Sequence, residues 1–540
     1  MSEKVRKTIA VQGSILAMAG IISKIIGFLY RIPMANVMGN TGNGLYSVSF
    51  GIYNVALTLS SYSMPLAVSK LMSARIAKKQ YKDADRLFKR ALLFAFITGL
   101  IAALCLYFGA DFLAGLYKKD GLERPLRILA PTTFVVALLG TSRGYFQGHR
   151  NMVPTAASQV IEQIVNAIVS VVASAAFVNA CTDEALAPSY GAMGGTLGTL
   201  MGAISALLIF AGLFFVGRKQ RKAELSGEDT VTEDNSLIFK AIIFTVIPVI
   251  ISQTIYQFGY TLDDFLFGNI LSGKGLDEKI VTDWQGVFNT QYNQMINLPT
   301  AIATAMASAT LPSIVSSFTV KEYGRVKEKI DSVLKINMLI AIPSMFGLAA
   351  MADPMMAVLF PGLKEYHGLA VTLLVTGSSA VVFYTLSTLT TSVLQGCDRM
   401  NVPVIHCGIS LLLHGLIVGI LLKFTDLNVY ALIIGNVTFP MIVSLLNIRS
   451  LKKLLGYRMN LTEIIFKPLL AGAVCGITAF GAYLGMAHIF SAERIAVKAV
   501  IMAVAIVLGA LAYALMLVLL REFSKEELKS MPIIKKIYKK

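Results

Sequence analysis

Long runs of apolar residues, separated by short polar segments, recur from one end of the chain to the other. Each run reaches the roughly 20 residues that an α-helix needs to cross a bilayer. They predict fourteen membrane-spanning helices, over residues 10–37, 45–69, 91–117, 128–148, 153–180, 190–217, 237–262, 286–317, 332–360, 368–396, 402–422, 428–448, 463–487 and 495–520. Because fourteen is even, both ends of the chain are expected on the same side of the membrane.

The composition supports this class, because 55% of the residues are hydrophobic and only 15% are charged, far from the proportions of soluble domains. We therefore expect an all-α polytopic membrane protein. The N-terminal segment MSEKVRKTIAVQGS lacks a small-residue cleavage site after a short apolar core, so no removable signal peptide is expected. The five cysteines are scattered, which predicts neither a disulfide framework nor a metal cluster.

The distribution of positive charge predicts the orientation. Of the 48 Lys and Arg residues, 32 fall in the two tails and the loops on their side, 9 in the opposite loops, and 7 within spans or at their ends. Cytoplasmic loops of membrane proteins are the ones enriched in Lys and Arg. This asymmetry places both termini in the cytoplasm, and it explains most of the net charge of +17 without a nucleic-acid partner.

The chain also repeats itself. SYSMPLAVSK at 61–70 resembles SATLPSIVSS at 308–317, GADFLAGLY resembles MADPMMAVLF, and YFQGHRNMVP resembles VLQGCDRMNVP, with offsets of 247, 242 and 248. Two copies of a six-helix unit would insert the same way up, as in transporters whose halves are related by an axis along the membrane normal. We expect lobes at 1–217 and 237–448, a cytoplasmic linker at 218–236, and two further helices with a basic tail at 449–540.

Motifs for chemistry are missing. The sequence has no GxxxxGK[ST] phosphate loop, no HExxH and no GxSxG, so the protein is not expected to be an enzyme. The five histidines show no metal-ligand spacing. His406 and His414 both fall in the span 402–422, where packing or helix-to-helix hydrogen bonds are the favoured interpretation.

Two cations inside the first span are the strongest functional signal. Lys24 and Arg31 in SKIIGFLYRIP are seven residues apart, which is two helical turns, so they share one face of a helix. A cation at bilayer depth costs at least roughly 2.5–3.5 kcal/mol, and such residues usually face a wet cavity. The alternative is that they snorkel to the headgroups. Gly27 and Pro33 favour a bend that would turn this face inward.

A few other polar residues lie at depth. Glu162 is expected near the middle of the membrane, paired, protonated or lining a cavity, in either a substrate path or a structural hydrogen bond. Asp263 either binds a coupling cation or begins an outer loop. Gln294 and Asn297, in YNQMINLP, are weaker candidates for substrate contact. Arg143 and Arg150 are expected to be interface anchors.

Several strings resemble a known family. SKIIGFLYRIP, RGYFQGHRNMVPTAASQVIEQIVN, NLPTAIATAMASATLPSIV and SKEELKSMPIIKKIYK are similar to the SpoVB/YtgP branch of polysaccharide-biosynthesis membrane proteins. This branch belongs to the multidrug/oligosaccharidyl-lipid/polysaccharide exporter superfamily and is close to the MurJ lipid II flippases. The resemblance covers essentially the whole chain, and its most specific string is RGYFQG followed by NMVPT and EQI.

The resemblance implies a fourteen-helix exporter with two lobes around a cationic cavity. Its implied activity is flipping an undecaprenyl-diphosphate-linked sugar, lipid II above all. Lys24 falls on a family cation position by the match to SKIIGF, and Asp263 resembles an acidic position that can take part in sodium binding. Where the family has an Arg followed by an Asp, this chain has Tyr30 and Arg31, and Gln294 stands where MurJ proteins carry an Arg.

The leading hypothesis is therefore a lipid-linked oligosaccharide flippase of the bacterial cytoplasmic membrane, acting as a monomer among membrane lipids. We expect no cofactor apart from coupling to Na⁺ or H⁺. A cation-coupled multidrug exporter of the same fold is the alternative, although it would favour an acidic cavity. A membrane glycosyltransferase or polymerase would need a cluster of carboxylates at the outer face, which the sequence does not show.

Overall fold

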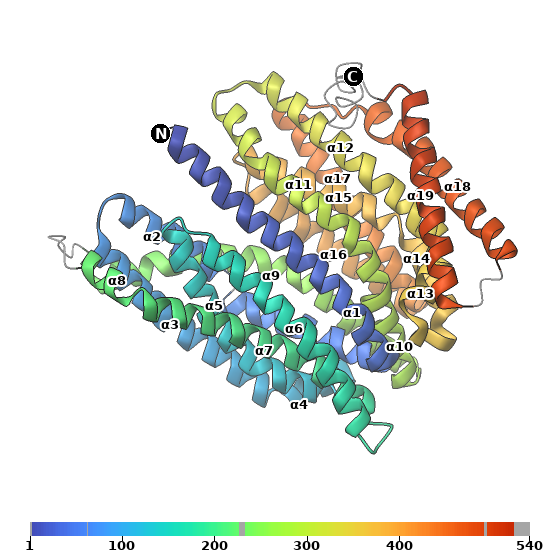
Figure 1. Cartoon of the computed structure of the whole chain (residues 1–540), viewed down its shortest axis with the longest axis horizontal. Helices are drawn as coiled ribbons and strands as arrows, with labels where there is room; N and C mark the ends of the chain where they lie inside the picture. Colours follow the sequence, from blue (N-terminus) through green and yellow to red (C-terminus); the bar gives the residue numbers. More distant parts are fainter. Residues whose placement is uncertain (1–2, 62, 226–232, 491–493, 523–540) are drawn as a thin grey trace. The chain divides into compact units, whose positions relative to one another are not determined.

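The chain folds into helices joined by short connections (Figure 1). The computed structural model describes residues 3–61, 63–225, 233–490 and 494–522. The chain divides into two compact units. Unit 1 is Met1–Thr290 with Gly419–Asn428, and unit 2 is Gln291–Val418 with Val429–Lys540. The lobe boundaries expected from the repeat stay a prediction.

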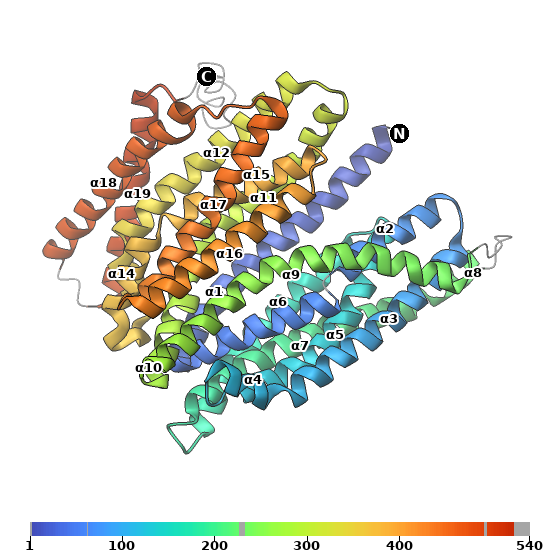
Figure 2. The same ribbon diagram turned by 180° about the vertical axis from the view of Figure 1, so that it is seen from behind.

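Unit 1 contains the first eleven helical elements and the end of a later one. They are α1 (Glu3–Ser60), α2 (Met64–Ala77), α3 (Tyr81–Phe108), α4 (Ala110–Tyr117), α5 (Glu123–Gly148), α6 (Val153–Ala180), α7 (Ala187–Val216), α8 (Arg218–Leu225), α9 (Asn235–Gly273), α10 (Glu278–Gly286) and the π-helical turn η1 (Val287–Tyr292), whose last two residues belong to unit 2. Figure 2 shows α3, α5, α6 and α7 running side by side.

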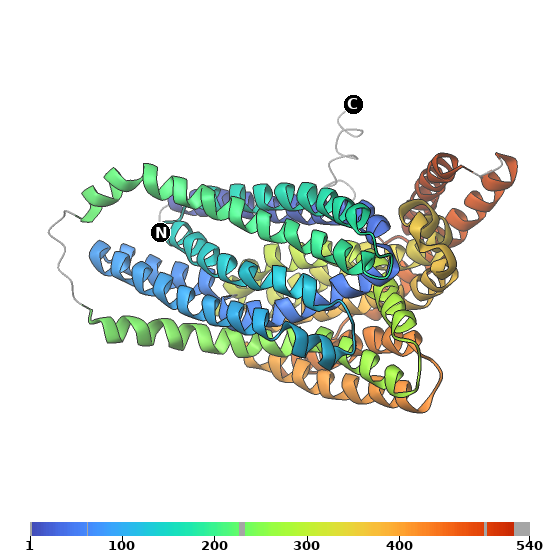
Figure 3. The same ribbon diagram turned by 90° about the horizontal axis from the view of Figure 1, so that it is seen from below.

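Unit 2 contains the remaining elements. They are α11 (Asn293–Thr319), α12 (Tyr323–Ala350), α13 (Ala352–Leu359), the 3₁₀ turn η2 (Pro361–Tyr366), α14 (His367–Gly377), α15 (Ala380–Gly396), α16 (Asn401–Phe424), α17 (Val429–Leu455), the π-helical turn η3 (Thr462–Phe466), α18 (Lys467–Ile489) and α19 (Ile495–Leu519). Helices α18 and α19 pack against each other, as the red pair in Figure 3 shows.

The helices have the lengths and the apolar surfaces of membrane spans. Among the described residues, ten helices are long and apolar enough to cross a bilayer, or eleven if the pair 361–377 and 380–396, bent by 46°, is one span. Many of their leucine, isoleucine, valine and phenylalanine side chains are exposed, as lipid contact requires. The all-helical membrane class is therefore confirmed, whereas the count of fourteen spans stays a prediction.

The first expected bend was misplaced. The span predicted at 10–37 and the first part of the span predicted at 45–69 are joined in α1, and the residue with non-helical backbone angles is Gly39, at φ 68° and ψ −179°. Helix α1 continues through Gly27 and Pro33. A positive φ is easy only for glycine, which explains why the chain turns at Gly39. By contrast, α6 coincides with the predicted span 153–180.

Helix lengths and turns recur along the chain at the offsets of the sequence repeat. A 28-residue helix followed by an 8-residue helix occurs as α3 with α4, and again as α12 with α13. The turns before these pairs contain Lys79 and Lys321, at φ 61° and 59°. Arg150 and Asp398 are likewise left-handed, at φ 60° and 57°. The same helix ends thus occur twice, with a lysine in both copies of the first turn and with Arg150 or Asp398 in the second.

Small residues allow α6 and α7 to pack closely. The glycines Gly194, Gly198 and Gly202 form a stripe along α7 with a spacing of four. A methyl group on Gly194 would lie 2.5 Å from the backbone N of Ser174, and one on Gly198 would lie 2.6 Å from that of Ser170. Close backbone approach at small residues is a main source of packing energy between membrane helices, so this seam fixes α6, which carries the polar residues described next.

Candidate substrate-binding site

Helix α1 lies along α6 in a parallel register. Asn166 Nδ2 donates to the Tyr30 hydroxyl over 3.3 Å, and a methyl group on Gly27 would lie 3.7 Å from Gln163 Oε1. Both pairs are separated by 136 residues, so the two helices run in the same direction at this contact. The cation-bearing turns of α1 therefore lie beside the polar part of α6.

Both predicted cations are accessible. The side chains of Lys24 and Arg31 are exposed, and Arg31 lies close to the phenols of Tyr30 and Tyr46, which are themselves buried. Within the described residues, neither cation forms an ion pair. Their positive charges are therefore balanced by no carboxylate in this part of the chain.

Glu162 is paired. Its Oε2 lies 2.6 Å from Arg143 Nη2, and the two side chains are only 19% and 15% exposed. Arg143 Nε also donates to Ser158 Oγ over 3.2 Å. Arg143, which was expected to be an interface anchor, has its guanidinium paired with the Glu162 carboxylate. The two charges of this pair cancel, so the positive charges of Lys24 and Arg31 remain unbalanced.

Asp263 lies inside a helix. Because α9 continues to Gly273, the alternative in which Asp263 begins an outer loop is wrong. Asp263 and its neighbour Asp264 are both buried. Asp264 Oδ1 accepts from Asn289 Nδ2 over 2.8 Å and from Gln285 Nε2 over 3.2 Å. Buried amides thus hold one carboxylate of this pair in place.

A buried lysine that was not among the predicted site residues also lies in this polar region. Lys119, in the connection between α4 and α5, is 1% exposed and donates from Nζ to Thr282 Oγ1 over 2.8 Å. Burial lowers the pKa of Lys119 to about 8, although Asp264, Glu278 and Asp283 oppose the shift. Within the described residues, no group of three or more His, Cys, Asp or Glu side chains is arranged to hold a metal ion.

The remaining candidates belong to unit 2. Gln294 is buried and Asn297 is exposed, both in the first turns of α11. His406 Nδ1 lies 2.7 Å from Asn447 Oδ1, and His414 Nδ1 lies 3.1 Å from the carbonyl oxygen of Gly435. The prediction that these histidines make helix-to-helix contacts is confirmed.

A family model and several proteins of known name match this sequence. A family model described as polysaccharide biosynthesis protein matches residues 10–318, which is more than half of the chain. Lipid II flippase MurJ of Bacillus subtilis (strain 168) is 25% identical over 77% of this chain and 76% of its own length. Stage V sporulation protein B of the same organism is 24% identical over 96% of this chain and 97% of its own length.

Solved structures show the same fold. A lipid II flippase MurJ in an inward closed conformation matches with a TM-score of 0.68 and 14% identity, over 94% of this chain and 99% of that chain. An inward-facing multidrug resistance MATE transporter matches with a TM-score of 0.65 and 16% identity, over 83% and 99%. The chain therefore shares the fold of these two solved structures, and it is a member of the polysaccharide biosynthesis protein family.

Proposed function

We propose that the protein is a flippase that moves an undecaprenyl-diphosphate-linked oligosaccharide, lipid II or a related cell-wall precursor, across the bacterial cytoplasmic membrane by alternating access. The observation that carries the proposal is the charge balance of unit 1. Glu162 is neutralised by Arg143, whereas Lys24 and Arg31 are exposed within an apolar helix and have no ion-pair partner among the described residues.

The chemistry of the cargo explains why these two cations are kept. A diphosphate cannot enter hydrocarbon unaided, because a buried charge without a partner is very unfavourable. Two turns of helix place Lys24 and Arg31 about 10 Å apart along one face. The Arg31 guanidinium can bind phosphate oxygens in a bidentate way, and Lys24 supplies a compact point charge. Glu162 of unit 1, and Gln294 and Asn297 of unit 2, are also proposed to contact the substrate.

The proposed architecture has fourteen spans in two parallel six-helix lobes, with both termini in the cytoplasm. The recurring 28-residue and 8-residue helices support the two lobes. The charge asymmetry of 32 to 9 supports the orientation. Cysteine-accessibility labelling tests both, and labelling of the 218–236 loop from the outside of intact cells would contradict this topology.

The likeness to a MATE structure keeps a cation-coupled multidrug exporter as the alternative. The unbalanced charge of α1 is positive, and this disfavours cationic drugs as cargo. Coupling to Na⁺ or H⁺ is proposed at Asp263, where two neighbouring carboxylates are buried. A flippase that depends on neither ion would contradict this part of the proposal.

The decisive experiment is complementation of a strain depleted of its lipid II flippase, with growth normalised to the amount of protein in the membrane. Lys24→Arg should retain much of the activity, whereas Lys24→Gln should lose it. Arg31→Lys should be weaker than wild type, because a fork is replaced by a point charge. Lys240→Gln is the matched control, since Lys240 is another exposed lysine in a long apolar helix and should be silent.

The double neutral variant separates binding from anchoring. If both cations contact one ligand, Lys24→Gln with Arg31→Gln should cost less than the sum of the single changes. Protein level should hold, because removing a cation from the membrane relieves an insertion penalty. Full complementation by this double variant would refute the proposed role of the two cations.

A further inference from the structure

A short basic helix follows the last span of the first repeat. Helix α8 directly follows α7 and contains four cations and one carboxylate in eight residues, RKQRKAEL. Transport of a lipid-linked sugar assigns no task to it. Two of its residues, Arg221 and Leu225, contact the body of unit 1.

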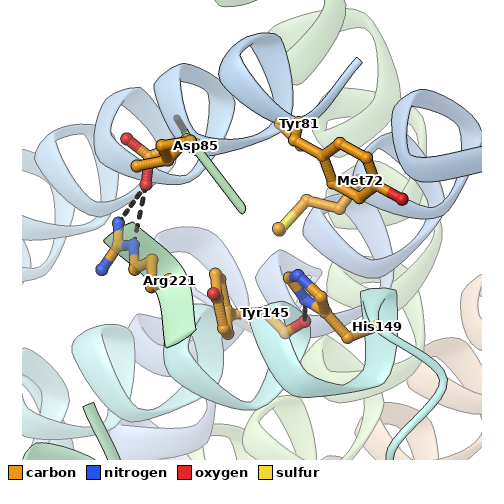
Figure 4. A pocket seen from close by; sticks show the side chains of 8 residues that line it. Met72, Tyr81, Asp85, Tyr145, His149 and Arg221 are labelled. Carbon is orange, nitrogen blue, oxygen red and sulfur yellow. Dashed lines mark hydrogen bonds and ion pairs between the residues drawn. The ribbon is translucent and has the colours of Figure 1, made fainter. Parts of the chain in front are cut away.

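Arg221 fastens α8 to the body of unit 1. Its Nε donates to Asp85 Oδ1 over 2.8 Å, and its Nη2 donates to the same oxygen. The guanidinium carbon also lies 5.5, 5.6 and 5.9 Å from the ring centroids of Phe88, Tyr145 and Phe214. A carboxylate and three rings together form a specific receptor for a cation. Figure 4 shows Asp85 and Tyr145 on either side of Arg221.

This attachment fixes which face of α8 points outward. Leu225, one turn after Arg221, lines the same hollow as Met72 and Tyr81, so these two residues mark the inner face. Arg218, Lys219 and Lys222 are exposed. One cation of α8 is therefore bound to the body of unit 1, and the side chains of the other three are exposed.

The exposed cations stand next to an apolar surface. Phe215 and Val216, the last two residues of α7, are 77% and 81% exposed. In a helix that spans the membrane, exposed apolar side chains face lipid. The cations of α8, which begin two residues after Val216, therefore lie at the boundary between the acyl chains and the headgroups.

We propose that Arg218, Lys219 and Lys222, together with Phe215 and Val216, form a docking surface for anionic phospholipid headgroups such as phosphatidylglycerol, and that Arg221 is the residue that positions it. The charge of the surface and of the lipid are opposite, and the apolar pair places the surface at headgroup depth. Each cation near an anionic membrane surface strengthens binding roughly fivefold. The inference does not depend on what the protein transports.

The test measures binding of lipid to the full-length protein in detergent. Phosphatidylglycerol is titrated against phosphatidylcholine, with tryptophan fluorescence and the apparent Tm as readouts. Wild type should prefer phosphatidylglycerol. Lys219→Gln with Lys222→Gln should weaken the preference by roughly 25-fold, about fivefold for each charge. The matched control is Lys118→Gln with Lys364→Gln, which removes two exposed lysines from other connections and should keep the preference.

Arg221→Gln tests the positioning role separately. This variant keeps all three exposed cations but frees α8, so it should also lose part of the preference. The loss of preference caused by Arg221→Gln should be smaller at high salt, because salt screens the electrostatic contribution to lipid binding in every variant. The proposal is overturned if the α8 double variant binds phosphatidylglycerol as wild type does, if the control loses as much, or if inorganic phosphate competes with the lipid at equal concentration.

Discussion

The pair formed by Arg143 and Glu162 can be tested by a double-mutant cycle that also decides what Glu162 does. With the charged atoms 2.6 Å apart, the centres of the two charged groups are about 4 Å apart. At an effective dielectric constant of about 20 this corresponds to an attraction of about 4 kcal/mol. The side chains of Arg143 and Glu162 are 15% and 19% exposed, so residual hydration reduces the coupling free energy to roughly 2–4 kcal/mol.

The cycle compares Glu162→Gln, Arg143→Gln and the double change. Each single change leaves one charge without its partner in a mostly buried site, and should lower the free energy of unfolding by about 3–5 kcal/mol. The double change should recover most of that loss, because Gln at both positions can still hydrogen-bond. The assay is reversible unfolding of the purified protein in mixed micelles, with Trp284 as the intrinsic probe.

The same variants in the complementation assay separate structure from transport. If Glu162 only supports the fold, the double variant should regain transport along with stability. A substrate-path role predicts recovered stability without recovered transport. Additive effects of the two single changes on unfolding, with a coupling below about 0.5 kcal/mol, would refute the ion pair as the reason for these residues.

Three further changes have defined outcomes. Gly198→Ala should lower the free energy of unfolding by about 1–3 kcal/mol through overpacking against α6, whereas Gly212→Ala on the same helix, with open space around it, should be neutral in the same measurement. Lys119 has a lowered pKa in the folded protein, so unfolding binds a proton between about pH 8 and 10.5. The free energy of unfolding of wild type should therefore rise by about 3 kcal/mol relative to that of Lys119→Met as pH rises through this window. A difference between the two proteins that does not change with pH would contradict this. Glu522→Gln should lower the apparent Tm, because the buried carboxylate lies 3.2 Å from Lys335, and an unchanged Tm would mean that this pair contributes nothing.

Apolar run length located the long helices, although only ten or eleven helices among the described residues are long and apolar enough to cross a bilayer, against fourteen predicted spans. Val153–Ala180 was predicted to the residue, because a run of apolar residues between Pro154 and the polar CTDE segment has two sharp ends. The break in α1 was missed because Pro33 and Gly27 look like stronger helix breakers than Gly39. A membrane helix tolerates proline when neighbours satisfy the freed carbonyl, so only the backbone angles could identify the turn.

Contacts between helices were harder to foresee. The Arg143–Glu162 pair had a usable signal, since two opposite charges lie on the two arms of the hairpin α5–α6. Nothing in the sequence around Lys119 distinguishes a buried lysine from the exposed Lys118 beside it. Its burial depends on the approach of α10, more than 150 residues later, and such long-range contacts carry no local pattern.

The left-handed residues at the helix ends carry a consequence for how the protein is made. Among the residues that the structure describes, six of the eight non-glycine residues with positive φ are Lys or Arg, including Lys79, Arg150 and Lys321. Glycine at these three positions would relieve roughly 1–2 kcal/mol of backbone strain each. It would also remove cations that the insertion machinery reads when it orients the nascent chain. Selection for thermal stability and selection for correct biogenesis therefore act in opposite directions on the same residues, and a glycine-stabilised variant is expected to yield fewer correctly inserted molecules per cell.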